Sequence, residues 1–284
     1  WAFSVKVPQT GATAHRNQHQ RGFVGFMNAY LLTGDDRYLD PWRKQMDKVN
    51  AQKKVVDGKA LYPSMYGAKG WYAYTPRRYE HNARELYYLS MKPEDRRRAG
   101  SDRWLDYLEG KDPKYPEVAL RADLERVRRR VRGMRDDPTT PDTRLSDDPM
   151  RFGMADVGSL VELMVGGLHI RRLGSVLHCR VRYFDPVKRR AGLPDGVAAL
   201  VEKLTADSVT LTLVNTDVLD GRTLIVQAGG YGEHEFVAVA IDGRKTKVGA
   251  AHLRVRLAAG AGARLVLQMR RYVHQPRLAF PWDR

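Results

Sequence analysis

Cysteine is nearly absent from this sequence: Cys179 is the single one among 284 residues. No disulfide can therefore form within the chain, and the redox compartment stays open because lone cysteines are tolerated everywhere. Long apolar runs are absent as well. The most apolar window, residues 157–170, contains Glu162 and is shorter than the roughly 20 residues that cross a bilayer. We expect no membrane-spanning segment.

Several motifs of enzymes and cofactor proteins are also missing. There is no His-Glu-x-x-His pattern for zinc and no Gly-x-Ser-x-Gly elbow for a serine nucleophile. The glycine-rich residues 229–232 lie between expected strands and open no helix, so they form no phosphate loop. Asp35 and Asp36 fall in an expected turn as caps, and no carboxylate pair stands out as the acid and base of a glycosidase. The sequence predicts no metal and no cofactor, and Cys179 fits a core thiol better than a nucleophile.

Acidic residues are outnumbered: 49 Lys and Arg stand against 33 Asp and Glu, for a net charge of +16. The excess is spread through the chain rather than gathered in a tail, which favours acidic partners without indicating a dedicated arm. The densest arginine run lies in an expected helix over residues 117–134 and just beyond its end. An amphipathic surface helix and a nucleic-acid interface both fit this run. Interleaved Asp123 and Glu125, and the absence of a zinc-finger or helix-turn-helix signature, disfavour nucleic acid.

The first half of the chain shows helical spacing. Apolar residues fall at i, i+3, i+4, i+7 and i+8 from Phe23 to Leu31, and Gly34 is placed to end that helix. A second helix from Asp35 or Asp36 to Val49 makes an antiparallel helical hairpin. Other segments expected here are an extended approach over residues 1–22, helices over 77–91, 103–108, 117–134 and 156–165, and a proline-rich crossing loop over 136–149.

The second half changes to a period of two, which is typical of strands. Strands are expected over residues 209–214, 224–227, Glu235–Ile241, 253–257 and 264–269, with a sixth over 177–183 and a helix over Val197–Leu204. Asp242-Gly243 is a hairpin signal. The sequence thus predicts an α+β protein. Its helical domain covers residues 1–150, and an antiparallel β-sandwich domain with a leading helical connection covers residues 151–284.

Residues 55–76 lose periodicity and indicate a long loop. Five large aromatic residues gather there among glycines: Tyr62, Tyr66, Trp71, Tyr72 and Tyr74. Flat aromatic faces stack on sugar rings or on bases, and they also close hydrophobic cores. A substrate-binding loop and a plug over the helical domain therefore both fit this segment.

Two further segments carry candidate acid–base groups. His15 and His19 stand at i, i+4, and a helix would place them on one face. Zinc binding, a polar surface, and a substrate-binding or acid–base role all fit this pair. His81 and Glu85 have the same spacing in the helix after the aromatic segment. They would orient one another for proton transfer, although an ordinary solvated helix face fits them as well.

The run Tyr30-Leu31-Leu32-Thr33-Gly34-Asp35-Asp36-Arg37-Tyr38-Leu39 resembles the helix–turn–helix joint of the (α/α) toroid carbohydrate-active enzymes. These include several glycoside hydrolase and polysaccharide lyase families. Many of them place an antiparallel β domain after the toroid, which is the order expected here. A complete toroid has more helices than this chain supplies. The resemblance, over residues 15–110 and the domain order, therefore implies the C-terminal portion of such a protein with an incomplete toroid.

The resemblance also implies a sugar-binding cleft lined by aromatic side chains. In the lyases of this group, a His or Tyr removes the proton next to a uronate carboxylate, and an Arg neutralises that carboxylate. By this resemblance the catalytic candidates are His15, His19, His81 and Tyr72. The substrate-binding candidates are Arg16, Tyr62, Tyr66, Trp71, Tyr74, Arg84 and Glu85.

Two functions of different classes follow from the sequence. The first is a glycoside hydrolase or polysaccharide lyase that acts on a glycan. The basic charge of the chain favours an anionic glycan as its substrate. The second is a non-catalytic binding module for acidic polymers. The chain opens on Trp1 and not on methionine, so we expect a processed or truncated form. A secreted or periplasmic location fits that expectation.

Overall fold

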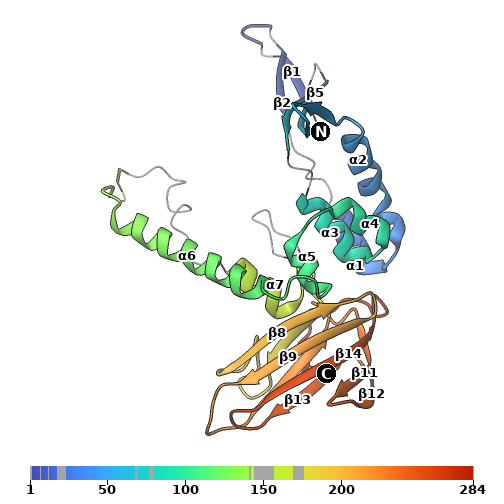
Figure 1. The fold of residues 1–284 in the computed structure, drawn as a ribbon, viewed down its shortest axis with the longest axis vertical. Coiled ribbons are helices and arrows are strands. Elements are labelled where there is room, and N and C mark those ends of the chain that lie inside the picture. The colour runs from blue at the N-terminus through green and yellow to red at the C-terminus, as the bar shows by residue number, and fades with distance from the viewer. Residues whose placement is uncertain are drawn as a thin grey trace. The chain divides into compact units, whose positions relative to one another are not determined.

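The computed structural model describes residues 2–6, 8–11, 13–17, 24–67, 70–76, 80–140, 142–143, 157–168 and 176–283. At residues 2–6, 13–17, 66, 67, 80 and 81 it describes the backbone alone. The chain divides into two compact units, Trp1–Asp102 and Arg103–Arg284. Helices are spread through the N-terminal half and antiparallel sheets fill the C-terminal part, so the α+β class is confirmed (Figure 1).

The first unit combines short helices with two small antiparallel sheets. Its helices are α1 (Val24–Thr33), the 3₁₀ helix η1 (Asp36–Tyr38), α2 (Asp40–Asn50), α3 (Glu80–Ser90) and α4 (Pro93–Ala99). One sheet pairs β1 (Ala2–Lys6) with β2 (Thr13–Asn17). The other has the order β3-β4-β5, with β3 (Lys54–Val56), β4 (Lys59–Gly67) and β5 (Gly70–Thr75).

The joint between α1 and α2 forms where the sequence predicts it. Gly34 has a φ of +66°, and its N–H donates to the Tyr30 carbonyl over 2.7 Å, so it ends α1 as expected. The Asp35 carboxylate then accepts from the Arg37 N–H over 3.0 Å and caps η1. After this joint, α2 buries the apolar stripe of Trp42, Met46 and Val49 as its contribution to the core.

The expected loop over residues 55–76 is wrong: this segment is the sheet of β3, β4 and β5. Tyr62 pairs with Thr75, and Tyr66 pairs with Trp71 across a turn at Gly67 and Gly70. A proline usually argues against a strand. Pro63 nevertheless lies inside β4, beyond the stretch where β3 pairs with that strand. The proline and the surrounding glycines hid the strands from the sequence pattern.

The described residues of the second unit form two antiparallel sheets and three helices. The helices are α5 (Arg103–Leu108), α6 (Tyr115–Arg135) and α7 (Gly158–Val165). One sheet has the order β13-β10-β6-β7, from β13 (His252–Leu257), β10 (Arg222–Ala228), β6 (Val181–Asp185) and β7 (Arg190–Ala191). The other has the order β12-β11-β14-β9-β8, from β12 (Arg244–Ala250), β11 (Glu235–Ile241), β14 (Gly262–Arg270), β9 (Ser208–Asn215) and β8 (Val197–Leu204).

Most of these strands lie where the period of two predicts them. Asp242 and Gly243 both have positive φ, of +48° and +78°, and join β11 to β12 as the hairpin signal indicates. The helix expected over Val197–Leu204 is wrong, because this segment is the edge strand β8. Its Ala, Leu and Glu favour a helix, but pairing with β9 buries Val201 and Leu204 and overrides that preference.

Helices α5 and α7 belong with the sheets of the second unit. The Tyr107 hydroxyl of α5 donates to the Val201 carbonyl of β8 over 3.1 Å, and α7 also packs against β8. The units consequently divide between Asp102 and Arg103, ahead of the expected domain boundary at residue 150. Within the described ranges, no helix has the length and apolar content that a membrane span requires.

Candidate functional site

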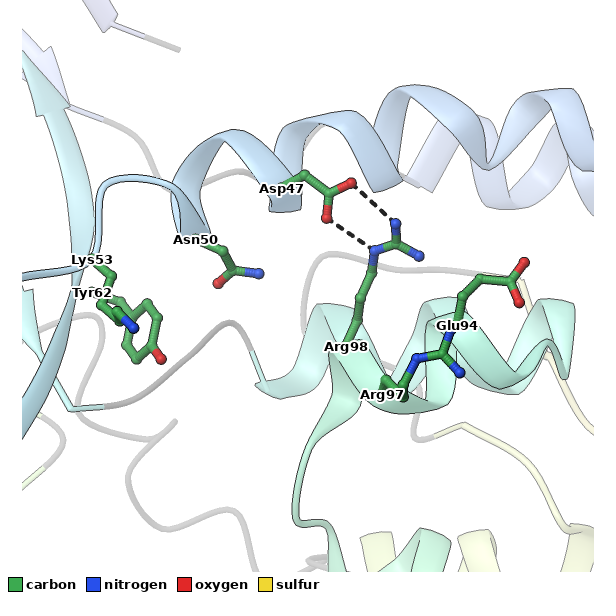
Figure 2. Close-up of a pocket in the computed structure, with 7 residues that line it drawn as sticks. All are labelled: Asp47, Asn50, Lys53, Tyr62, Glu94, Arg97 and Arg98. Carbon is green, nitrogen blue, oxygen red and sulfur yellow. Dashed lines mark hydrogen bonds and ion pairs between the residues drawn. The ribbon is translucent and has the colours of Figure 1, made fainter.

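A hollow of about 390 Å³ lies in the first unit, where α2 and α4 meet the start of the β3-β4-β5 sheet (Figure 2). This volume falls within the usual range of small-ligand sites, roughly 300–1,000 Å³. Seven residues line it: Asp47, Asn50, Lys53, Tyr62, Glu94, Arg97 and Arg98. The hollow brings together segments that are distant in the sequence: Asp47 of α2 and Arg98 of α4 lie 51 positions apart.

Helix periodicity decides which side chains face the hollow. The buried stripe of α2 points its Trp42 and Val49 to the core, so Asp47 and Asn50 are left on the outer side. In α4 the buried residues are Asp95 and Ala99, at i and i+4. The remaining α4 residues Glu94, Arg97 and Arg98 therefore line the hollow from the opposite wall.

A network of ion pairs locks α4 onto α2. Arg98 forms a two-pronged pair with the Asp47 carboxylate, with both N···O distances 3.0 Å, and donates to Asp95 over 2.8 Å. The hydrogen bond to Asp47 holds the pKa of Arg98 above its ordinary value. Arg43, on α2, binds the fully buried Asp95 from the other side over 2.8 Å. Arg98 is thus a fixed wall of the hollow rather than a free donor.

Three donor side chains of the hollow are uncommitted. Lys53, Asn50 and Arg97 form no side-chain hydrogen bond or ion pair with any residue that the structure describes, and Lys53 and Arg97 are exposed. Glu94, also exposed, adds an uncommitted acceptor, and Tyr62 presents its ring beside Lys53 (Figure 2). Two exposed cations, an amide and a phenol around one hollow are groups that bind carboxylate or sulfate together with hydroxyls.

The expected aromatic cluster is split between the two faces of a hairpin. Tyr62 is buried and lines the hollow, and strand alternation puts Trp71 on the same face. Tyr72 and Tyr74 lie on the opposite face, where Tyr72 is 38% exposed and the Lys54 ammonium sits 4.2 Å from the Tyr74 ring centroid. Tyr62 is therefore the one aromatic candidate among the described side chains that lines the hollow.

The charged candidates of α3 serve the packing of the first unit. The Arg84 guanidinium binds the Asp102 carboxylate over 2.6 Å, and Glu85 is buried. Neither lines the hollow. The helix that contains Arg84 and Glu85 was predicted correctly. The structure gives Arg84 a carboxylate partner within the protein.

Several candidates are residues of which the structure describes only the backbone, or which lie outside the described residues. His15 and Arg16 lie in β2, Tyr66 lies in β4 and His81 lies in α3, each with the backbone alone described. His19 lies outside the described residues. Thr13–Asn17 is a strand, in keeping with the extended approach expected there, so His15 does not lie on the helix that would place it on one face with His19.

Sequence reasoning missed six of the seven lining residues: Asp47, Asn50, Lys53, Glu94, Arg97 and Arg98. The signal that could have found α4 is weak. Pro93 at its first turn, followed by Glu94 and Asp95 and then by three arginines, fits a short helix with acidic residues first and basic residues last. Its lack of an apolar stripe concealed it.

A second polar cluster lies deep in the second unit. His178, Arg180, Glu233 and His234 are each at most 3% exposed, around the turn between β10 and β11. Burial, with Arg180 nearby, lowers the pKa of His178 to about 4, and burial raises the pKa of the neighbouring Cys179 thiol. No group of three or more metal-ligating side chains suited to a metal ion occurs in the described parts of the chain. We interpret the cluster as structural.

The buried His178 predicts a loss of stability in acid. The pKa of His178 in the folded protein, about 4, lies below the ordinary value of 6.5. Its contribution to the free energy of unfolding is therefore complete above pH 6.5 and is lost as pH falls toward 4. We expect roughly 3 kcal/mol of pH-dependent stability from this group. His178→Leu, measured by urea unfolding over this pH range, should flatten the profile. The matched substitution His274→Leu changes an exposed histidine, and a profile flattened equally by both would contradict the assignment.

Comparisons with known proteins give one partial match. Residues 98–151, which include α5 and α6, match a family described as a domain of unknown function (DUF8034). No curated protein and no solved structure matches the chain. The match covers a minor part of the sequence and includes Arg98 alone among the residues of the hollow.

Proposed function

We propose that the first unit binds an acidic glycan in the hollow between α2 and α4. The observation that carries this proposal is the set of uncommitted donors, Lys53, Asn50 and Arg97, around one cavity of about 390 Å³. Lys53 and Arg97 bring two positive charges without an ion-pair partner among the described residues to the lining, and such charges favour an anionic ligand. Arg98 is committed to Asp47 and to the buried Asp95, so an anion would pair with Lys53 and Arg97 first.

The chemistry of the remaining lining residues suits a sugar better than a simple anion. Asn50 and Glu94 offer a donor and an acceptor for ring hydroxyls. Tyr62 supplies an aromatic edge and a hydroxyl at the floor of the hollow. A uronate or sulfated sugar carries both a charged group and hydroxyls, so one unit of such a polymer matches the lining groups that are not engaged in the Asp47–Arg98 pair.

The reaction class is a further part of the proposal. We propose a glycoside hydrolase or polysaccharide lyase with a toroid-like helical domain and a β-sandwich, in a secreted or periplasmic location. The α1–α2 helical hairpin in the first unit and the two larger antiparallel sheets late in the chain support this architecture. In that setting His15, His19 or His81 would move the proton, or Tyr72 would do so for a glycan that extends to the hairpin face opposite to Tyr62. Arg16 and the hairpin aromatics Tyr66, Trp71 and Tyr74 would hold the flanking sugars.

Glycan binding by the full chain tests the proposal. Calorimetric titration with uronate polymers, sulfated polymers and neutral glucans should give binding to acidic members only. Lys53→Ala combined with Arg97→Ala should weaken that binding at least about tenfold, because each lost charge-assisted hydrogen bond contributes roughly 1.5–3 kcal/mol. Formation of unsaturated uronates, or of new reducing ends, then distinguishes a lyase from a hydrolase.

A matched pair of substitutions separates a site from general charge. Arg129→Ala combined with Arg132→Ala removes the same charge from exposed positions on α6 and should change affinity less than twofold. Equal losses in both double variants, with a steep dependence on salt, would favour the competing function, a non-catalytic module for acidic polymers. Absence of binding to every acidic glycan by folded protein rejects the proposed site.

A further inference from the structure

Helix α6 of the second unit exposes the apolar side chains that its sequence gathers into one stripe. All 21 of its residues are described, and only Ala119 and Asp123 are buried. Leu120, Leu124 and Met134 are 38%, 50% and 43% exposed, and Val127 and Val131 are half-buried. A soluble helix normally covers such a stripe, so its exposure marks a surface suited to a partner.

The stripe has the spacing of a coiled-coil seam. Steps of four, three, four and three residues connect Leu120, Leu124, Val127, Val131 and Met134. That alternation assigns positions a to Leu124 and Val131, and positions d to the other three. A seam of two apolar residues per heptad accepts one helix packed at a shallow angle. The shape therefore specifies a helical occupant.

Arginine dominates the edges of this seam. The three e positions are Arg121, Arg128 and Arg135, and the g positions are Asp123 and Arg130. Asp123 is already engaged: it accepts hydrogen bonds from the Ser159 N–H and hydroxyl, each over 2.9 Å, and anchors α6 to α7. The exposed edge that remains is positive, with Arg121 and Arg128 held only by surface pairs to Glu117 and Glu125.

These charges decide between possible occupants. A second copy of α6 would bring arginines against arginines in the antiparallel arrangement, where e positions face one another. A nucleic acid would satisfy the arginines but leave the apolar seam exposed to water. We infer that α6 is a docking surface for an amphipathic helix of a partner protein, with apolar a and d residues and acidic residues at e and g. This inference is independent of the glycan site.

Designed peptides test the inference on the full chain. One labelled peptide of about three heptads carries Leu at a and d and Glu at e and g, and a second carries Lys at e and g. Like charges at the edges keep each peptide from pairing with itself. Fluorescence anisotropy should show the Glu peptide binding at least about tenfold more tightly than the Lys peptide.

Three variants make the result decisive. Leu124→Ser with Val131→Ser leaves the charge unchanged and should weaken the Glu peptide at least about tenfold, since apolar burial is lost. Arg128→Glu with Arg135→Glu should reverse the preference toward the Lys peptide. Arg129→Ala, at an outward position, should change nothing. All substituted positions are exposed or half-buried, and circular dichroism verifies folding.

Other outcomes overturn the inference. Equal binding of both peptides, or binding unaffected by the serine pair, excludes the seam. Tight binding of a labelled DNA duplex that ignores the serine pair identifies a nucleic-acid surface instead. A dimer in sedimentation velocity that the serine pair dissociates identifies a second copy as the occupant.

Discussion

Arg43→Ala is expected to lower the free energy of unfolding of the first unit by about 3–5 kcal/mol. Arg43 binds three carboxylates at once: Asp36 over 2.7 Å, Asp40 over 2.9 Å and Asp95 over 2.8 Å. Asp95 has no exposed surface, and its charge is balanced by ion pairs with Arg43 and Arg98. Removing one of two cations from a buried carboxylate leaves charge that water cannot reach.

The measurement must resolve the first unit from the second. Amide hydrogen exchange at α2 and α4, read by mass spectrometry, reports the opening free energy of these helices directly. Arg43→Lys should recover only part of the loss, because an ammonium cannot serve three carboxylates in the fork geometry of a guanidinium. Arg37→Ala provides the matched control: Arg37 also pairs with an aspartate, Asp35, but its side chain is 87% exposed. A similar loss in both variants would contradict the role assigned to Arg43.

The same network connects stability to the glycan hollow. Asp95 holds Arg98, and Arg98 holds Asp47, so Arg43 fixes two walls of the cavity without lining it. Arg43→Ala should therefore weaken glycan binding even where the protein is still folded. This is a positioning effect, and it predicts that Arg43→Lys recovers binding in proportion to the exchange protection of α4.

Local signals in the sequence predicted the parts of the fold that local chemistry determines. Gly34 ends α1 because glycine reaches the left-handed conformation without strain, and Asp242-Gly243 turns a hairpin for the same reason. The strand β8 escaped prediction because Ala198, Leu200 and Glu202 favour a helix in isolation. Its conformation depends on pairing with β9, and the amino-acid pattern of the segment itself does not show that pairing.

The candidate site was harder to predict than the fold. Tyr62 stood out through the composition of its segment, yet strand alternation separates it from Tyr72 and Tyr74. Arg97 lies on a helix with no apolar stripe, and Lys53 lies in the turn after α2. Their convergence depends on the packing of α4 against α2, which the buried Asp95 mediates. A buried carboxylate held by arginines has no signature in a sequence.

Glu233→Ala is expected to destabilise the second unit by about 3–5 kcal/mol. The Glu233 carboxylate is 1% exposed and accepts hydrogen bonds from the Gly230 N–H over 3.2 Å and the Tyr231 N–H over 2.8 Å. Its backbone carbonyl accepts from the Val273 and His274 N–H groups, which fixes the segment after β14 to this turn. Truncation leaves two buried donors unsatisfied and opens a cavity beside Arg180.

A substitution at Gly229 tests the role of the Glu233 carboxylate independently. Its φ is +86°, and a Cβ there would lie 2.4 Å from both Glu233 carboxylate oxygens, so Gly229→Ala should also expel the carboxylate. Burial raises the pKa of Glu233, so the charged form of this carboxyl opposes folding. Glu233→Gln keeps one acceptor oxygen without that charge and should therefore cost less than alanine.

Urea unfolding of the full chain, combined with hydrogen exchange at β10 and β11, measures these losses. Glu125→Ala is the matched control in the same unit, because Glu125 is 54% exposed and pairs with Arg128 on the surface of α6. If the turn between β10 and β11 is organised by the carboxylate, Glu233→Ala and Gly229→Ala should open the same amides, while Glu233→Gln opens fewer. Losses of equal size for alanine and glutamine would instead show that side-chain packing contributes little, because glutamine keeps the side-chain volume, and that both carboxylate oxygens are needed for the bonds to Gly230 and Tyr231.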